Sequence, residues 1–196
     1  MKYTDIYQTL EDRQNYEEIE KNGPFFCSIK YPNGKLKKGS KEPWLGEGYY
    51  FWDTRIEDAQ WWGNTIYGAK GYVICHTKYD QHSSCLYDMV GNVEQFDEFV
   101  KCARYILEKR KLQSITFPTV LSYLKKMESF NYSAIRVWPY PQSMETTGIE
   151  FPSIYSSKKT ILAKSSKIQI CFFDRTLLTE PYRIVDNKTF TADQTI

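Results

Sequence analysis

The sequence predicts a single domain of the α+β class. Segments rich in aromatic and β-branched residues, as in strands, lie towards both ends of the chain. Two segments in the middle repeat their apolar residues at the spacing of an amphipathic helix. The 196 residues are enough to bury one sizeable core, and the sequence contains no internal repeat. We therefore expect one domain spanning residues 1–196.

Six strands and four helices are expected along this domain. The strands are expected at residues 5–9, 49–52, 71–76, 133–138, 167–173 and 182–185. The helices are expected at residues 9–22, 54–62, 93–111 and 118–127. Thr9 and Thr54 each precede acidic residues in the pattern of a helix N-cap, and Gly23 is placed to end the first helix.

Three polar segments are expected to lack regular structure. Residues 31–43 combine prolines and glycines with lysines, which predicts an exposed loop. Residues 139–166 contain three prolines and many serines and threonines. A structureless connection of that length is often functional, and a plain surface insertion is the equal alternative. The tail after about residue 186 shows no apolar period and is expected to fray.

Charge and cysteine content argue against several classes of protein. The 26 basic and 24 acidic residues give a net charge of +2, too balanced to attract nucleic acid or an acidic membrane by bulk electrostatics. The five cysteines lack the spacing of a disulfide framework or a zinc site, and two histidines are too few to lead a metal site. No apolar run approaches the ~20 residues of a membrane span. We expect a cytoplasmic protein without a metal or a membrane partner.

Residues 45–63 contain the most specific pattern in the chain. Gly46 and Gly48 precede four consecutive aromatic residues, 49–52, and Trp61 follows in the next predicted helix. Glycine lets the backbone approach a neighbour closely, and aromatic rings can cover both faces of a flat ligand. Composition alone favours a core role for these rings, but their joint spacing favours a ligand pocket.

This pattern resembles that of the ADP-ribosyltransferase fold, the family of poly-ADP-ribose polymerases and diphtheria-type toxins. The family pattern Gly-x-Gly-[Ile/Phe/Tyr]-Tyr-Phe, followed by a helix with Ala-x-aromatic, matches residues 46–51 and 59–61. The resemblance implies a core made of a split antiparallel β-sheet. Residues 90–130 are then a helical insertion into this fold. It also implies that NAD is the cofactor and substrate, and that ADP-ribose passes to a macromolecular acceptor, either protein or nucleic acid.

The resemblance assigns the nicotinamide-binding residues by position. Tyr50 corresponds to the tyrosine that stacks on the nicotinamide, and Trp61 to the aromatic residue that covers its other face. Each cation–π contact of this kind contributes about 0.5–2 kcal/mol. Gly48, with Tyr49 beside it in the motif, lets the main chain approach the carboxamide and hold it through an N–H and a C=O.

Two further family positions carry different residues here. Gln8 or Thr9 replaces the histidine that bonds the adenosine ribose, and counting back from Gly23 slightly favours Thr9. Gln169 replaces the glutamate that bonds the nicotinamide ribose and assists the nucleophile. Glutamine and threonine still form hydrogen bonds with ribose hydroxyls. A neutral amide, however, cannot act as a general base and stabilises an oxocarbenium-like state less well than a carboxylate.

These substitutions leave several alternatives open. Gln169, Tyr50 and Glu150 are the candidate catalytic residues. Glu150, or Glu145 in the same polar segment, could supply the missing carboxylate, and simple solvation is the alternative for both. Arg136 could meet a phosphate or form a structural ion pair. The protein is thus expected to be an NAD-dependent transferase or a degenerate domain that binds NAD or ADP-ribose without turnover. A third reading is an interaction module that docks a partner on the helices of residues 93–128.

Overall fold

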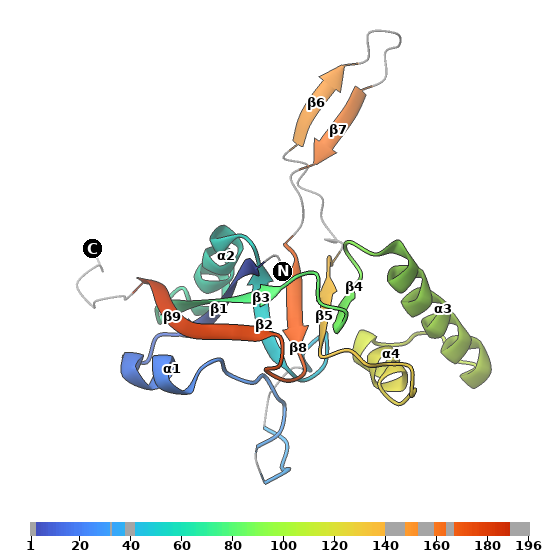
Figure 1. Ribbon diagram of the computed structural model, residues 1–196, viewed down its shortest axis with the longest axis horizontal. Coiled ribbons are helices and arrows are strands. Elements are labelled where there is room, and N and C mark those ends of the chain that lie inside the picture. The colour runs from blue at the N-terminus through green and yellow to red at the C-terminus, as the bar shows by residue number, and fades with distance from the viewer. Residues whose placement is uncertain are drawn as a thin grey trace.

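The fold is described by a computed structural model for residues 3–31, 33–37, 42–139, 148–152, 159–163 and 167–188. These residues form a curled, mostly antiparallel sheet with the strand order β4-β5-β8-β2-β1-β3-β9, a separate hairpin and four helices (Figure 1). The strands are β1 (Tyr3–Glu11), β2 (Tyr49–Asp53), β3 (Tyr72–Asp80), β4 (Leu86–Asp88), β5 (Ala134–Val137), β6 (Gly148–Pro152), β7 (Lys159–Ala163), β8 (Gln169–Phe172) and β9 (Leu178–Lys188). The helices are α1 (Tyr16–Asn22), α2 (Ile56–Tyr67), α3 (Val93–Arg110) and α4 (Phe117–Leu124). The predicted α+β class is confirmed.

Both threonine caps predicted from the sequence are wrong, although the helices exist. Thr9 lies within β1, where it pairs with Ile74 and its hydroxyl donates to the carbonyl of Ala59 at 2.9 Å. Thr54 has a φ of 67°, and its hydroxyl donates to Asp53. In both places sheet pairing and tertiary hydrogen bonds outweigh the local capping pattern, so α1 and α2 begin later than expected.

The prediction of an unstructured segment over residues 139–166 is wrong where the structure describes it. Strands β6 and β7 form an antiparallel hairpin there, and among the described elements they contact only each other. Strand β4, three residues long, was also not predicted. In the predicted loop of residues 31–43, Gly34 has a φ of 80° at a turn. Strand β9 continues to Lys188, and the rest of the predicted tail lies outside the described residues.

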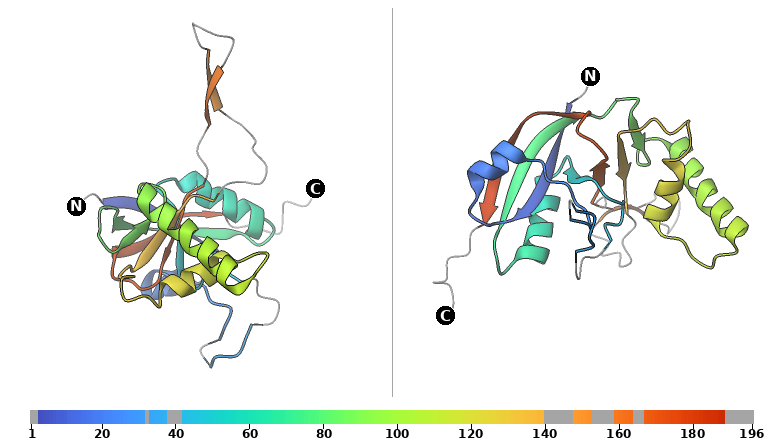
Figure 2. Two further views of the ribbon diagram at one scale, coloured as in Figure 1. Left: turned by 90° about the vertical axis from the view of Figure 1, so that its right-hand side faces the viewer. Right: turned by 90° about the horizontal axis from the view of Figure 1, so that it is seen from below.

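The two faces of the sheet are covered by different helices. On one face, Ile6 and Phe51 pack with Ile19 of α1. On the other face, Trp52 packs with Ala59 of α2. Figure 2 shows α1 and α2 on opposite sides of the strands, and α3 with α4 at the β4–β5 end of the sheet. The sheet face that α2 covers near Trp52 is therefore covered by α4 at the β5–β8 end.

The helical segment of residues 90–130 connects two neighbouring parallel strands. Leu86 of β4 pairs with Ala134 of β5, so α3 and α4 form the crossover that a parallel pair requires. Helix α4 packs its buried residues against β5 and β8, and Phe99 of α3 stacks on Phe117 of α4 with ring centroids 4.3 Å apart. Asn92 caps α3 and Thr116 caps α4, each with its side chain.

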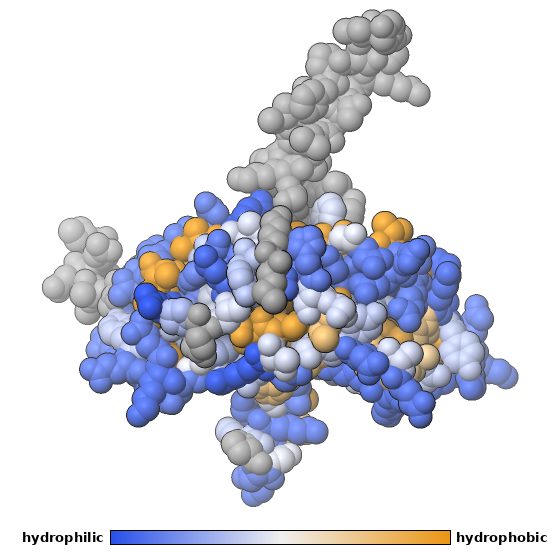
Figure 3. All heavy atoms as spheres, in the orientation of Figure 1, coloured by the Kyte–Doolittle hydropathy of each residue, from blue (hydrophilic) through white to orange (hydrophobic). Residues whose placement is uncertain are grey.

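The surface is mainly polar on the face shown in Figure 3. Hydrophilic residues cover most of that face, and the hydrophobic ones form separate small groups. None of the helices in the described ranges is long and apolar enough to cross a bilayer.

Gly48 is required by the close approach of neighbouring chain segments. A Cβ atom at this position would lie 2.4 Å from the Cys171 Sγ and 2.6 Å from the Phe172 carbonyl oxygen. The main-chain groups of Gly48 also pair with those of Cys27 at 2.8 and 3.1 Å. Space here is therefore taken by β8 and by the segment that contains Cys27.

Gly48→Ala is expected to lower the free energy of unfolding by about 1–3 kcal/mol, because β8 or the Cys171 side chain must move. Urea denaturation measures this loss. The neighbouring substitution Glu47→Ala, at an exposed position, is the control and is expected to change stability by about 0.5 kcal/mol or less. Equal effects of the two substitutions would contradict the tight packing of Gly48.

Candidate functional site

Tyr50, Trp61 and Gln169 are all neighbours of Trp52 on one face of the sheet, and Gln169 comes from a distant part of the sequence. Gln169 of β8 pairs with Trp52 of β2, and Tyr50 lies on the same face as Trp52 because side chains alternate along a strand. Helix α2 places Trp61 against Trp52, with ring centroids 6.1 Å apart and planes at 89°. The residues expected to hold nicotinamide thus form one region.

Trp61 is the exposed aromatic ring of this region. It is 44% exposed, whereas Trp52 beneath it is 6% exposed. The Lys167 Nζ lies 4.2 Å from the centre of the Trp61 ring. Tryptophan is the side chain that attracts cations most strongly through its ring face. The exposed surface of Trp61 therefore accepts a positive charge.

The Tyr50 hydroxyl is engaged within the protein. It donates to the Gly46 carbonyl at 2.7 Å and accepts from the Leu45 N–H at 2.9 Å. Burial raises the pKa of Tyr50, so the phenol stays protonated near neutral pH. The hydroxyl holds the turn that precedes β2, and the half-buried aromatic ring packs against the core cluster that contains Cys171.

Of the two polar atoms of the Gln169 side-chain amide, one is engaged by a described residue. Its Oε1 accepts a hydrogen bond from the Trp44 indole N–H at 2.5 Å. Within the described part of the chain its Nε2 has no hydrogen-bond partner. The side chain is therefore oriented by Trp44 and keeps a free donor.

Gln8 and Thr9 point to opposite faces of the sheet, and Thr9 shares the face of Tyr50. Gln8 is 5% exposed. Its Nε2 donates to the carbonyls of Phe25 and Tyr50 at 3.0 and 3.3 Å, and its Oε1 accepts from the Phe25 N–H and the Tyr182 hydroxyl. Gln8 thus joins β1, β2, β9 and the segment after α1, and Thr9 ties β1 to α2.

Gly48 and Tyr49, which were expected near the carboxamide, contact other parts of the protein. The N–H and C=O of Gly48 both pair with Cys27. Tyr49 points to the α1 face, where its ring contacts Phe26 edge-on at 5.0 Å and lies 5.1 Å from the guanidinium carbon of Arg175. In this structure the main-chain pair of Gly48 is occupied within the protein.

Glu150 lies in β6, where its main chain pairs with Ile161 of β7. Its side chain lies outside the described part of the structure. Because β6 and β7 contact no other described element, no described contact joins Glu150 to Gln169.

Among the described residues, one cavity lies at the end of β1 and another lies over β3 and β9. The larger, of about 240 Å³, is at the end of β1 and is lined by Leu10, Glu11, Arg13, Asn15, Ile19, Phe25 and Tyr67. The smaller, of about 160 Å³, is lined by His76, Lys78, Thr179, Pro181 and Arg183. At the larger cavity, hydrogen bonds from Lys70 and Arg13 lower the pKa of Glu11. The larger cavity is therefore mostly apolar with charged groups on its rim.

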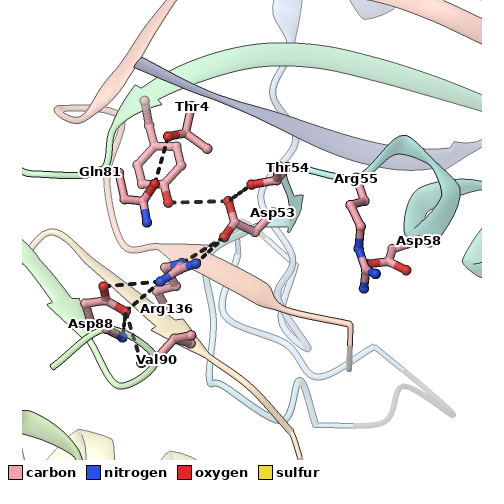
Figure 4. A network of polar contacts seen from close by, with 11 residues as sticks. Thr4, Asp53, Thr54, Arg55, Asp58, Gln81, Asp88, Val90 and Arg136 are labelled. Atoms are coloured by element: carbon pink, nitrogen blue, oxygen red, sulfur yellow. Dashed lines mark hydrogen bonds and ion pairs between the residues drawn. The ribbon is translucent and has the colours of Figure 1, made fainter. Parts of the chain in front are cut away.

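A buried ionic network on the α1 face was not predicted as a unit. Arg136 and Asp53 are 7% and 3% exposed. The Arg136 Nε and Nη2 lie 2.8 and 2.7 Å from the Asp53 Oδ2, and its Nη1 lies 3.1 Å from the Asp88 Oδ1 (Figure 4). Burial alone would lower the pKa of Arg136, but the two carboxylates raise it. Of the two roles considered for Arg136, the structure contains the ion pair.

The described residues contain no group of three or more His, Cys, Asp or Glu side chains placed to hold a metal ion. No protein-family model matches the chain, and neither does any curated protein or solved structure. The structure itself defines a mixed α+β protein in which helix α2 places an exposed tryptophan, Trp61, over Trp52 of the curled sheet.

Proposed function

We propose that this protein has an ADP-ribosyltransferase-like fold, binds NAD and transfers ADP-ribose to a macromolecular acceptor, either protein or nucleic acid. The observation that supports this proposal best is the exposed Trp61 ring, which already contacts a cation and packs on Trp52, the residue that pairs with Gln169. The nicotinamide ring of NAD is flat and positively charged, so stacking on Trp61 combines dispersion with a cation–π attraction.

In this proposal Gln169 contacts the ribose next to the nicotinamide. Its Nε2 has no hydrogen-bond partner among the described residues, and the Trp44 indole fixes the direction of the amide. A ribose hydroxyl can accept such a hydrogen bond. Tyr50, whose ring lies on the same sheet face, supplies the second aromatic surface.

The larger cavity, which is lined by α1-face residues such as Ile19 and Phe25, is the proposed place for the other end of an NAD molecule that passes the end of β1. Its volume of about 240 Å³ lies below the roughly 300–1,000 Å³ of pockets that bury whole ligands, so it fits only part of a dinucleotide. Ile19 and Phe25 provide apolar walls for an adenine ring, and the Arg13 charge can meet a phosphate. Gln8, which is fully hydrogen-bonded, then supports the wall through Phe25 and does not itself bind ribose.

A second candidate function is the binding of NAD or ADP-ribose without turnover. The neutral Gln169 favours it, because an amide can orient a ribose but cannot serve as a general base. The two functions share one pocket and differ only in whether the nicotinamide bond is broken.

Trp61→Ala is expected to weaken NAD binding at least about tenfold, because the mutant loses the stacking and cation–π contacts. Calorimetry on the purified protein measures this. Tyr105→Ala is the matched control, since Tyr105 is also an exposed aromatic residue with a lysine, Lys109, over its ring. The control is expected to bind NAD like the wild type. Absence of NAD binding to the wild type would refute both candidate functions.

Transfer is tested separately, with labelled NAD and a cell lysate. Labelled protein or nucleic acid would support the transferase. Release of nicotinamide without a labelled macromolecule would indicate hydrolysis of NAD, and binding without either would favour the second candidate function.

A further inference from the structure

Lys167 places a positive charge on the ring that the proposed ligand needs. Its Nζ lies 4.2 Å from the centre of the Trp61 ring. The other aromatic neighbours of Trp61 are Trp52 and Trp62, whose planes make angles of 89° and 50° with it. Neither neighbour stacks flat on Trp61, so the ring keeps a face that a cation can cover, and Lys167 covers it.

The main chain positions Lys167 next to Gln169. The Asp53 N–H donates to the Ile168 carbonyl at 3.0 Å, which extends the pairing of β2 with β8 beyond Gln169. Lys167 and Gln169 are two residues apart on this extended segment and therefore point to the same face. The ammonium thus reaches Trp61 from the same edge of the site as the proposed ribose contact.

A nearby carboxylate also favours this position of Lys167. Asp58 is three residues before Trp61 in α2, and its Oδ2 accepts from the Arg55 Nη2 at 2.9 Å. Burial raises the pKa of Asp58, while the charges of Arg55 and Lys167 oppose that rise. Lys167 is therefore within electrostatic reach of Asp58 as well as of the Trp61 ring.

We propose that Lys167 is an internal competitor for the exposed face of Trp61, and that it sets the affinity of the site for a cationic aromatic ring such as an N-alkylated nicotinamide. This inference rests on the proposed NAD function and specifies how ring binding at that site is controlled. An ammonium and a pyridinium repel each other and need the same ring area, so binding of one displaces the other. A neutral ring of the same shape gains less from Trp61 and displaces Lys167 less readily.

Calorimetry with NAD and with 1-methylnicotinamide, which carries only the cationic ring, tests the competition. Lys167→Met keeps an unbranched apolar side chain and removes the charge, and it is expected to bind both ligands about five- to tenfold more tightly than the wild type. Lys167→Arg keeps a cation that stacks on aromatic rings and is expected to stay close to the wild type. Lys109→Met, at the similar pair with Tyr105 on α3, is the control and is expected to change neither affinity.

The results separate the competitor role from the NAD function. Equal or weaker NAD binding by Lys167→Met would overturn the competitor role and leave the NAD function in place. If only 1-methylnicotinamide binds, and more tightly to Lys167→Met, the competitor role holds and the NAD function fails. If neither ligand binds any folded variant, both proposals are overturned. Thermal melts monitored by circular dichroism establish that each variant is folded.

Discussion

Gln169→Glu is expected to raise the rate of NAD hydrolysis about 100-fold, because a carboxylate replaces a neutral amide beside the developing oxocarbenium ion. The change keeps the geometry of the side chain. The Trp44 indole N–H, which donates to the Gln169 Oε1 at 2.5 Å, can donate equally to a carboxylate oxygen. Release of nicotinamide from NAD measures the rate for the wild type and the variant.

Two controls separate the effect of charge at this site from a general effect of charge. Gln169→Leu removes the amide without adding charge and is expected to give no gain. Gln81→Glu makes the same chemical change at a residue whose Oε1 accepts from the Thr4 hydroxyl at 2.9 Å, so its hydrogen bond is also kept. Unchanged hydrolysis in Gln169→Glu would show that the neutral side chain is not what limits turnover, and would favour the binding function.

Arg136→Met is expected to lower the free energy of unfolding by about 3–5 kcal/mol, because it leaves the buried Asp53 carboxylate without its cation. Asp53 accepts from both the Nε and the Nη2 of Arg136, and Asp88 accepts from its Nη1. The substitution therefore removes both ion pairs by which β5 is joined to β2 and β4. Urea denaturation measures the loss.

The surface pair of Arg13 and Glu11 provides the comparison. Arg13 has 72% of its side chain exposed, so Arg13→Met is expected to change stability by less than about 1 kcal/mol. If Arg136→Met does not fold, Asp88→Asn is the milder variant: it removes one charge and keeps the oxygen that accepts from the Val90 and Gly91 N–H groups. It is expected to lower stability by about 1–3 kcal/mol. A loss for Arg136→Met no larger than that for Arg13→Met would contradict the network.

The elements of the fold were largely predictable because their patterns are local. Enrichment in aromatic and β-branched residues marked the six predicted strands, and each overlaps a strand of the structure. The start of α1 was misplaced because Thr9 is held by Ile74 and Ala59, which are far away in sequence. The strand β4 has only three residues, and β6 and β7 lie in a segment whose prolines, serines and threonines indicated a loop.

The site was predictable only in part, since its residues depend on distant partners. The spacing of Tyr50 and Trp61 placed them correctly on one strand and the next helix. No local pattern could indicate that Cys27 pairs with the main chain of Gly48, or that Tyr182 binds Gln8. The roles of Tyr50, Trp61, Gln169 and Glu150 in NAD binding or catalysis stay predictions.

The position of β8 between β5 and β2 has a consequence for biosynthesis. Residues 169–172 join the β4–β5 pair to the rest of the sheet, so β2 and β5 both have an open edge until that segment leaves the ribosome (Figure 1). Sheets built from such long-range pairs fold slowly, and unpaired edges favour aggregation. A nascent chain that stops before β8 is therefore an expected target of chaperones, because the two parts of the sheet join only after β8 is made.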